Sequence, residues 1–251
     1  AGQRQAQLAH RLALFLGVWQ VAAGRVDARF LLPGPAEVAA SLAVHHRQLL
    51  FHSLITLTEV SLGFLAGGLS AGVVGYVIYR SRPLEGILMP YVVASQAVPV
   101  VAVAPLLVVW FGAGAPVKVA TAALVAFFPM LVSTVVGFRN IDPAYRDLMR
   151  AHSATATQTL LLLEIPAALP VLLGGMRVGV TLAVIGAVVG EFLGSDRGLG
   201  ALILVARGQY NTPLLFAATL VLVAVALALY GATALLERAV LAGRRRVTTV
   251  V

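Results

Sequence analysis

Long apolar stretches alternate with short polar segments along most of the chain. Several are about 20 residues long, the length that crosses the hydrocarbon core of a bilayer. None shows the two-residue alternation expected of strands in a membrane β-barrel. The pattern therefore predicts an all-α integral membrane protein with a single transmembrane domain over residues 1–251. Six spans are expected, at about 10–24, 54–79, 86–111, 117–138, 168–193 and 213–236.

Composition supports a membrane protein. Hydrophobic residues make up 60% of the 251 residues and charged residues only 11%, against about 25% charged in an ordinary soluble domain. The span at 10–24 is the shortest, and a cleavable signal peptide is the alternative for it, because a basic start, a short apolar run and small residues are typical of both. The sequence starts at an alanine and not at an initiator methionine, which is compatible with a longer N-terminus.

The net charge of +8 comes from basic residues that lie mostly on one side of the predicted spans. This distribution is typical of a membrane protein and argues against a nucleic-acid partner. With a cytoplasmic N-terminus, most basic residues fall in cytoplasmic segments, and both termini are then cytoplasmic. These basic residues are Arg4, Arg11, Arg80, Arg82, Arg139, Arg146, Arg150, Arg238 and Arg244 to Arg246.

No known catalytic motif is present, so we expect no catalytic residues and no metal site. The chain has no cysteine, which excludes disulfides and thiolate metal ligands. Its one lysine, Lys118, lies in "GAGAPVKVA", which lacks the Gly-Lys-Ser/Thr ending of a phosphate-binding loop. If transport is driven by ATP, a different subunit must bind the nucleotide.

Small residues and prolines mark the expected packing surfaces. Glycines at four-residue spacing let helix backbones approach closely. They are Gly63, Gly67, Gly68, Gly72 and Gly75 in the second span and Gly175, Gly179, Gly186 and Gly190 in the fifth. Pro90, Pro99 and Pro105 predict a kinked third span, either beside a water-accessible path or as a purely structural kink.

Four residues are candidates for the translocation pathway: Gln96, Pro99, Arg177 and Glu191. Ionisable residues within spans normally face the bundle interior or water. Arg177 and Glu191 are about 21 Å apart along a helix, too far to pair. Snorkelling or an interhelical bond is the alternative for Arg177. For Glu191 the alternative is a structural bond to the "SDRG" loop.

The segment 139–166, between the fourth and fifth spans, is too long for a simple turn. Pro143 can begin a helix, and Pro166 and Pro170 are expected to separate the segment from the fifth span. Its small residues would let a partner approach closely. A helix lying on the lipid surface is the alternative, suggested by "LLLLEI".

This segment resembles the cytoplasmic signature of the inner-membrane permease subunits of ABC importers, a Glu-Ala-Ala stretch, a glycine and a final Leu-Pro. Here it reads "DLMRAHSA" from Asp147 to Ala154 and closes on "PAALP" at Pro170. Asp147 replaces the usual glutamate, Met149 an alanine and Ser153 the glycine. Four further stretches resemble the nitrate, taurine and sulfonate branch of that family, which includes permeases for riboflavin and thiamine-precursor pyrimidines. They are "LPGPAEVAASL", "SQAVPVVAVAPLLVVWFGAG", "FFPMLVSTVVGFRNIDP" and "VVGEFLGSDRGLGALI".

The resemblance implies a permease of the type I importer fold in a bacterial inner membrane. It implies as partners a second permease copy, an ABC ATPase subunit that holds ATP and Mg²⁺, and an external solute-binding protein, with no cofactor on this chain. Residues 145–158 would form a coupling helix that docks on the ATPase through Asp147, Arg150, Ala151, Ser153 and Ala154. The transported solute would be a sulfonate- or nitrate-like anion or a vitamin or precursor. A stand-alone secondary transporter or channel, and a non-transporting scaffold, are the alternatives.

Overall fold

The computed structural model describes residues 31–193 and 195–247, the stretch 17–24, and residues 7, 10 and 14. Every regular element among them is a helix, which confirms the all-α prediction. Residues 17–24 of the first predicted span are helical, and most of its other residues lie outside the described part.

Four helical stretches are long and apolar enough to cross a membrane. They are α3 (His46–Arg80), α6 (Ala115–Arg139), the continuous stretch Ala156–Phe192, and Thr212–Ala242 of α11 (Thr212–Val247). A fifth is formed if α4 (Arg82–Ser95) and α5 (Val100–Phe111), which meet at 99°, are counted as one broken span. The shorter helices are α2 (Pro35–Val44), α7 (Pro143–Ala151) and α10 (Leu199–Gly208).

The stretch Ala156–Phe192 has three parts: α8 (Ala156–Thr159), a π-helical turn η1 (Leu160–Glu164) and α9 (Ile165–Phe192). We expected Pro166 and Pro170 to separate the fifth span from the segment before it. Instead, Pro166 lies in the first turn of α9 and Pro170 inside it. The i→i+5 bond from Ile165 to Leu160 widens the helix just before Pro166, which gives the ring of this proline room that a regular α turn would deny it.

The described residues divide into two compact units, and the division falls within α3 and α11. One unit contains the residues up to Thr56 and Asp196–Val225. The other contains Leu57–Ser195 and the residues from Ala226 onward. Because α3 and α11 run unbroken through the division, a single transmembrane domain stays our prediction.

In the smaller unit, α2 and α10 pack with the first part of α3 and of α11 around a core that includes Val38, Leu49, Leu202 and Leu214. Side chains of α3 cap the start of α10. The Gly198 amide donates to His52 Nδ1 (3.0 Å), and the Leu199 amide donates to Thr56 Oγ1 (2.8 Å). These bonds satisfy amides that a helix start leaves without an intrahelical partner.

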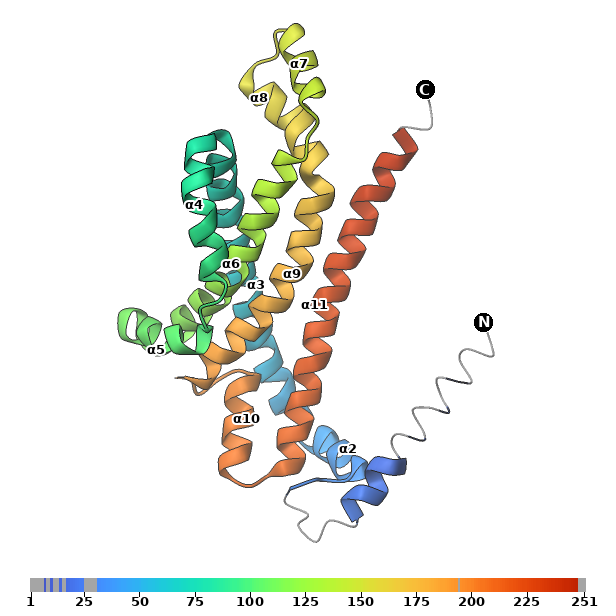
Figure 1. The fold of residues 1–251 in the computed structure, drawn as a ribbon. Coiled ribbons are helices and arrows are strands. Elements are labelled where there is room, and N and C mark those ends of the chain that lie inside the picture. The colour runs from blue at the N-terminus through green and yellow to red at the C-terminus, as the bar shows by residue number, and fades with distance from the viewer. Residues whose placement is uncertain are drawn as a thin grey trace. The chain divides into compact units, whose positions relative to one another are not determined.

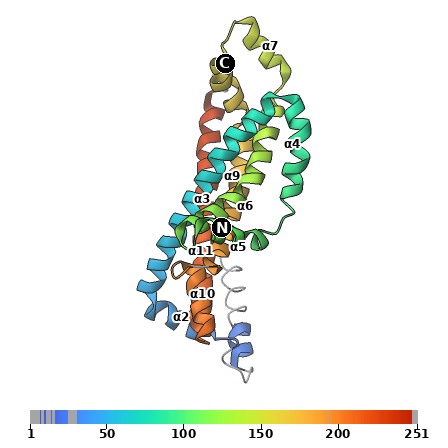
Figure 2. The same ribbon diagram turned by 90° about the vertical axis from the view of Figure 1, so that its left-hand side faces the viewer.

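In the larger unit, α6 packs against both α3 and α9, and α6 and α9 run side by side (Figure 1 and Figure 2). The glycine-rich faces predicted from the sequence make these contacts. Gly67 lies against the backbone of Ala123, and Gly186 lies against the backbone of Thr121 and Ala122. Gly72 is the exception, with open space where a Cβ would be. The prediction of close helix packing through glycine is otherwise confirmed.

Candidate functional site

The third predicted span is broken rather than kinked. α4 ends at Ser95 and α5 begins at Val100, with Pro99 as its N-cap residue. Three successive i→i−3 bonds, from the amides of Gln96, Ala97 and Val98, tighten the end of α4. Proline disfavours the helical conformation in the residue before it and donates no amide hydrogen bond. The break at Pro99 follows from both effects.

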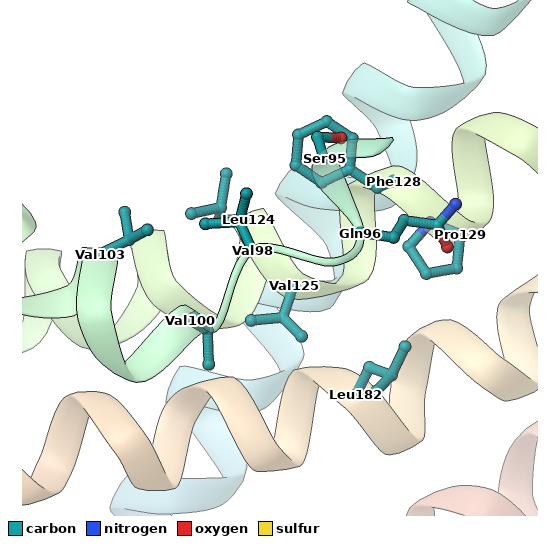
Figure 3. Close-up of a pocket in the computed structure, with 10 residues that line it drawn as sticks. All are labelled: Ser95, Gln96, Val98, Val100, Val103, Leu124, Val125, Phe128, Pro129 and Leu182. Atoms are coloured by element: carbon teal, nitrogen blue, oxygen red, sulfur yellow. The ribbon is translucent and has the colours of Figure 1, made fainter. Parts of the chain in front are cut away.

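A cavity of about 320 Å³ lies at this break, and Figure 3 shows the side chains around it. The residues that line it come from the α4–α5 region, from α6 and from α9. They are Ser95, Gln96, Val98, Val100, Val103, Leu124, Val125, Phe128, Pro129 and Leu182. No lining side chain is charged. Ser95 Oγ donates to the Val92 carbonyl (2.7 Å), which leaves the amide of Gln96 as the main polar group offered to the cavity.

The structure thus places one of the four pathway candidates, Gln96, in the cavity wall and a second, Pro99, at the helix break beside it. The two ionisable candidates lie elsewhere. Arg177 Nε is 2.9 Å from Glu237 Oε2 of α11, and the Arg177 guanidinium lies 5.4 Å from the centre of the Tyr230 ring. Arg177 therefore makes the interhelical bond that was its alternative interpretation.

Glu191 is fully buried in a charged cluster that the sequence did not reveal. Glu59 of α3 lies close to Glu191 and forms an ion pair with Lys118 of α6. Lys118 Nζ also donates to Ser195 Oγ (3.0 Å), so the cluster reaches the "SDRG" loop. Lys118, near the start of the predicted span at 117–138, is only 3% exposed. The cluster therefore ties α3, α6 and the end of α9 together, and these residues do not line the cavity.

The predicted docking segment forms α7, at the end of the hairpin made by α6 and α9 (Figure 1). Asp142 caps its start by accepting from the Ala144 amide (2.9 Å). The expected helix over 145–158 is divided, because α7 ends at Ala151 and Thr155 caps the start of α8. Asp147 and Arg150, two of the docking candidates, pair with each other on the exposed surface at 2.9 Å.

Ser153 explains where α7 ends. Its φ is 53°, in the left-handed region that favours glycine. The Ser153 amide donates to the Arg150 carbonyl (2.9 Å), and the Ala154 amide donates to the Met149 carbonyl (3.0 Å). These two bonds form the Schellman motif that closes many helices on a left-handed residue. Ser153 therefore occupies the position of the glycine in the signature that this segment resembles.

Replacing Ser153 by glycine should stabilise this turn by roughly 0.5–1 kcal/mol, because glycine adopts positive φ without strain. Amide hydrogen exchange of residues 149–158 should slow about two- to fivefold. The control is Ser153→Ala, which keeps a Cβ at the same φ. Equal exchange rates in the two variants would contradict this account of the turn.

Most of α7 is exposed. Tyr145 (58% exposed) and Leu148 (54%) lie on neighbouring turns, and Ala151 and Ser153 at the helix end are exposed as well. Exposed apolar groups on a small helical projection are typical of a surface that binds a partner. The candidate site thus has two parts, an uncharged cavity at a broken helix and an exposed helix at the end of the α6–α9 hairpin.

These features define the class of protein: a multi-pass helical membrane permease. The chain belongs to the family described as the binding-protein-dependent transport system inner membrane component, whose model matches residues 62–242. It is 45% identical over 211 residues to the riboflavin transport system permease protein RibX of Chloroflexus aurantiacus, covering 83% of this chain and 79% of that protein.

It is also 32% identical over 234 residues to the formylaminopyrimidine transport permease protein ThiX of Halalkalibacterium halodurans, covering 93% of this chain and 94% of that protein. Among solved structures, the fold is similar to a chain of the inward-facing MetNI methionine ABC transporter. That match has a TM-score of 0.64 and 21% identity, and it covers 76% of this chain and 95% of the other. The resemblance to ABC importer permeases is confirmed, and the protein is a permease subunit of an ABC importer.

Proposed function

We propose that α7 and the turn after it dock this permease onto a separate ABC ATPase subunit. The contact is made by Asp147, Arg150, Ala151, Ser153 and Ala154, which form the exposed end of α7 and its closing turn. The observation that carries the proposal is the exposure of Tyr145 and Leu148 beside these residues. ATP and Mg²⁺ are then held by the ATPase, because the one lysine of this chain is buried in an ion pair with Glu59.

The distribution of basic residues supports a cytoplasmic position for α7. Arg146 and Arg150 lie within it and Arg139 ends the preceding helix α6, while Arg80 ends α3 and Arg82 begins α4. The positive-inside rule favours a cytoplasmic position for such segments; with six spans, the predicted span at 10–24 included, both termini are cytoplasmic as well. An external binding protein delivers the solute at the opposite face, and a second copy of the chain completes the pathway.

The cavity at the α4–α5 break supports a solute that is an uncharged ring compound rather than an inorganic or sulfonate anion. An anion would need a cationic partner, but no residue that lines this cavity is charged. The ring of Phe128 offers an aromatic contact and Gln96 an amide that donates and accepts hydrogen bonds. Riboflavin- or pyrimidine-like compounds fit this lining, and they are what the names of RibX and ThiX state for those relatives.

The docking proposal predicts that Ser153→Trp prevents co-purification of the ATPase subunit, because a bulky ring is placed where the partner must approach. Membrane insertion and elution of the permease should stay unchanged. The control is Ala40→Trp, an equally bulky change at an exposed position of α2. Normal ATPase co-purification with Ser153→Trp would remove this segment from the docking role.

The pathway proposal predicts that Gln96→Leu lowers solute uptake about fivefold, the effect of losing one hydrogen bond worth about 1 kcal/mol. The measurement is uptake of riboflavin, and separately of taurine, by proteoliposomes that contain the complete importer with each permease variant. Gln48→Leu, at an exposed position of α3, is the control. Unchanged uptake in Gln96→Leu would exclude Gln96 from the pathway, and solute flux by the permease alone would favour the stand-alone transporter.

A further inference from the structure

Glu164 is a buried carboxylate in a run that otherwise reads as lipid-facing, "LLLLEI". It is the last residue of the π turn η1 and is 2% exposed. Two hydroxyls of α3 donate to it: Tyr79 Oη at 2.7 Å and Tyr76 Oη at 3.3 Å. The π turn thus directs a charged side chain toward α3, into the bundle.

Arg146 of α7 completes the cluster. Its Nε lies 3.5 Å from Glu164 Oε1. Its other nitrogens donate to the carbonyl of Phe138 near the end of α6 (2.7 Å) and to that of Ile141, two residues after α6 ends (3.1 Å). A guanidinium at the C-terminal carbonyls of a helix is also favoured by the helix dipole. Arg146 therefore connects α7 to α6 and to η1 at once.

The ring of Tyr79 lies at the centre of these contacts. The guanidinium of Arg146 and that of Arg139 are each 5.4 Å from the ring centre, within the range of cation–π attraction. Arg139 in turn forms an ion pair with Glu85 of α4. Through Tyr79, the contacts of α7 thus extend to α3 and, by way of Arg139, to α4.

No comparable contact ties the rest of α7 to the bundle. Within α7, only Arg146 and Met149 are even partly buried, and the other seven residues are exposed. A force applied to α7 can reach the bundle only through the chain connections at its two ends and through the side chains that face inward. Of these, Arg146 alone makes ionic and hydrogen-bonded contacts with other helices in the described residues.

We propose that Arg146, Glu164, Tyr76 and Tyr79 form a joint that positions α7 rigidly on α3, α6 and η1, so that a displacement of α7 moves these helices with it. The inference rests on the proposed docking of an ATPase at α7. Its physical basis is that the buried Glu164 accepts from two tyrosine hydroxyls and that the facing Arg146 is fixed by two backbone carbonyls, so that each partner of the ion pair is held in place by other hydrogen bonds. Without this joint, α7 would rotate about the chain connections at its two ends. A nucleotide-driven movement of α7 would then not displace α3 and α6.

Because the sequence contains no cysteine, a pair of introduced cysteines can be spin-labelled without first replacing native ones, and the movement of α7 relative to α3 can be measured directly. The pair Ala144→Cys on α7 and Val77→Cys on α3 uses two exposed positions in one unit. The labelled permease, diluted with unlabelled copies, would be assembled with its ATPase. The distance distribution between the labels is then measured without nucleotide and with Mg²⁺-ATP and vanadate.

With an intact joint, the distribution should be narrow and unchanged by nucleotide. With Glu164→Gln, the width of the distance distribution should increase about twofold or more. Nucleotide should also shift the distribution, because α7 then moves without α3. Tyr79→Phe, which removes only the 2.7 Å hydrogen bond, should give a smaller change in the same direction and is the variant to use if Glu164→Gln assembles poorly.

The matched control is Glu237→Gln, which breaks the ion pair with Arg177 between α9 and α11 and should leave the distribution unchanged. A narrow, nucleotide-independent distribution in both Glu164→Gln and Tyr79→Phe would overturn the joint, as would a nucleotide-dependent shift with the joint intact. Co-purification of the ATPase, measured on the same samples, tests the docking proposal separately. If Ser153→Trp still binds the ATPase, docking at α7 is wrong; if the ATPase binds but the distances do not respond to Glu164→Gln, only the joint is wrong.

Discussion

Replacing Lys118 by methionine should destabilise the permease by about 3–5 kcal/mol, enough to prevent recovery of folded protein. Methionine nearly matches the length of the lysine side chain but removes the cation that pairs with Glu59, which is 5% exposed and lies close to the fully buried Glu191. The buried carboxyl group of Glu59 would then lie close to that of Glu191 with its own cation removed. The yield of monodisperse protein in mild detergent and its thermal unfolding midpoint are the measurements.

A second substitution separates charge from packing. Glu59→Gln combined with Lys118→Met removes both charges of the ion pair and retains a hydrogen-bonding side chain toward Glu191. The double variant should recover a large part of the stability lost in Lys118→Met, because replacing a whole buried pair costs far less than breaking it. If the double variant is as unstable as Lys118→Met alone, Lys118 acts through packing or through Ser195 rather than by balancing the charge of Glu59.

Properties that depend on local sequence could be predicted well. Apolar length identified the four long helices and the broken α4–α5 pair, because the bilayer thickness fixes how many residues a span needs, whereas most of the first predicted span lies outside the described residues. Glycine spacing identified the faces of α3 and α9 that meet α6, because four-residue spacing is a property of one helix. Three prolines predicted a kink in the third span; the span is broken at Pro99, whereas Pro90 and Pro105 lie inside α4 and α5. Gln96, a pathway candidate, lines the cavity at this break.

Pairings between distant parts of the chain could not be predicted. The broken span α4–α5 lies between Glu59 and Lys118, and α10 lies between the helices that carry Arg177 and Glu237. The sequence around each residue therefore does not identify its partner. A general signal was nevertheless present. Charged residues in apolar segments must be paired, which makes Glu59 and Glu164 conspicuous even before their partners are known.

The end of the docking segment shows a different difficulty. Pro166 and Pro170 were interpreted as helix boundaries, but the boundary is the left-handed Ser153, where the sequence offers no glycine to mark it. Proline is tolerated in the first turn of a helix, and here a π turn precedes it. The spacing of prolines alone therefore cannot distinguish the start of a helix from its interruption.

Replacing Gly186 by alanine should destabilise the α6–α9 contact by about 1–3 kcal/mol, the usual cost of overpacking. A Cβ at Gly186 would lie 2.7 Å from the Thr121 carbonyl oxygen and 2.8 Å from the Ala122 Cα. Both are backbone atoms, so the clash can be relieved only by moving one helix away from the other. The measurement is the thermal unfolding midpoint in detergent, which should fall by several degrees.

Gly174, in the same helix, provides the control. A Cβ there would meet nothing within 4 Å, so Gly174→Ala should be neutral or stabilise α9 by up to about 1 kcal/mol through higher helix propensity. Leu182, one turn before Gly186, lines the cavity, so separation of α6 and α9 should also lower solute uptake in Gly186→Ala but not in Gly174→Ala. Equal unfolding midpoints for the two variants would mean that α6 and α9 do not pack as closely as Gly186 allows. Leu182 of α9 would then not lie in the cavity wall beside the α6 residues.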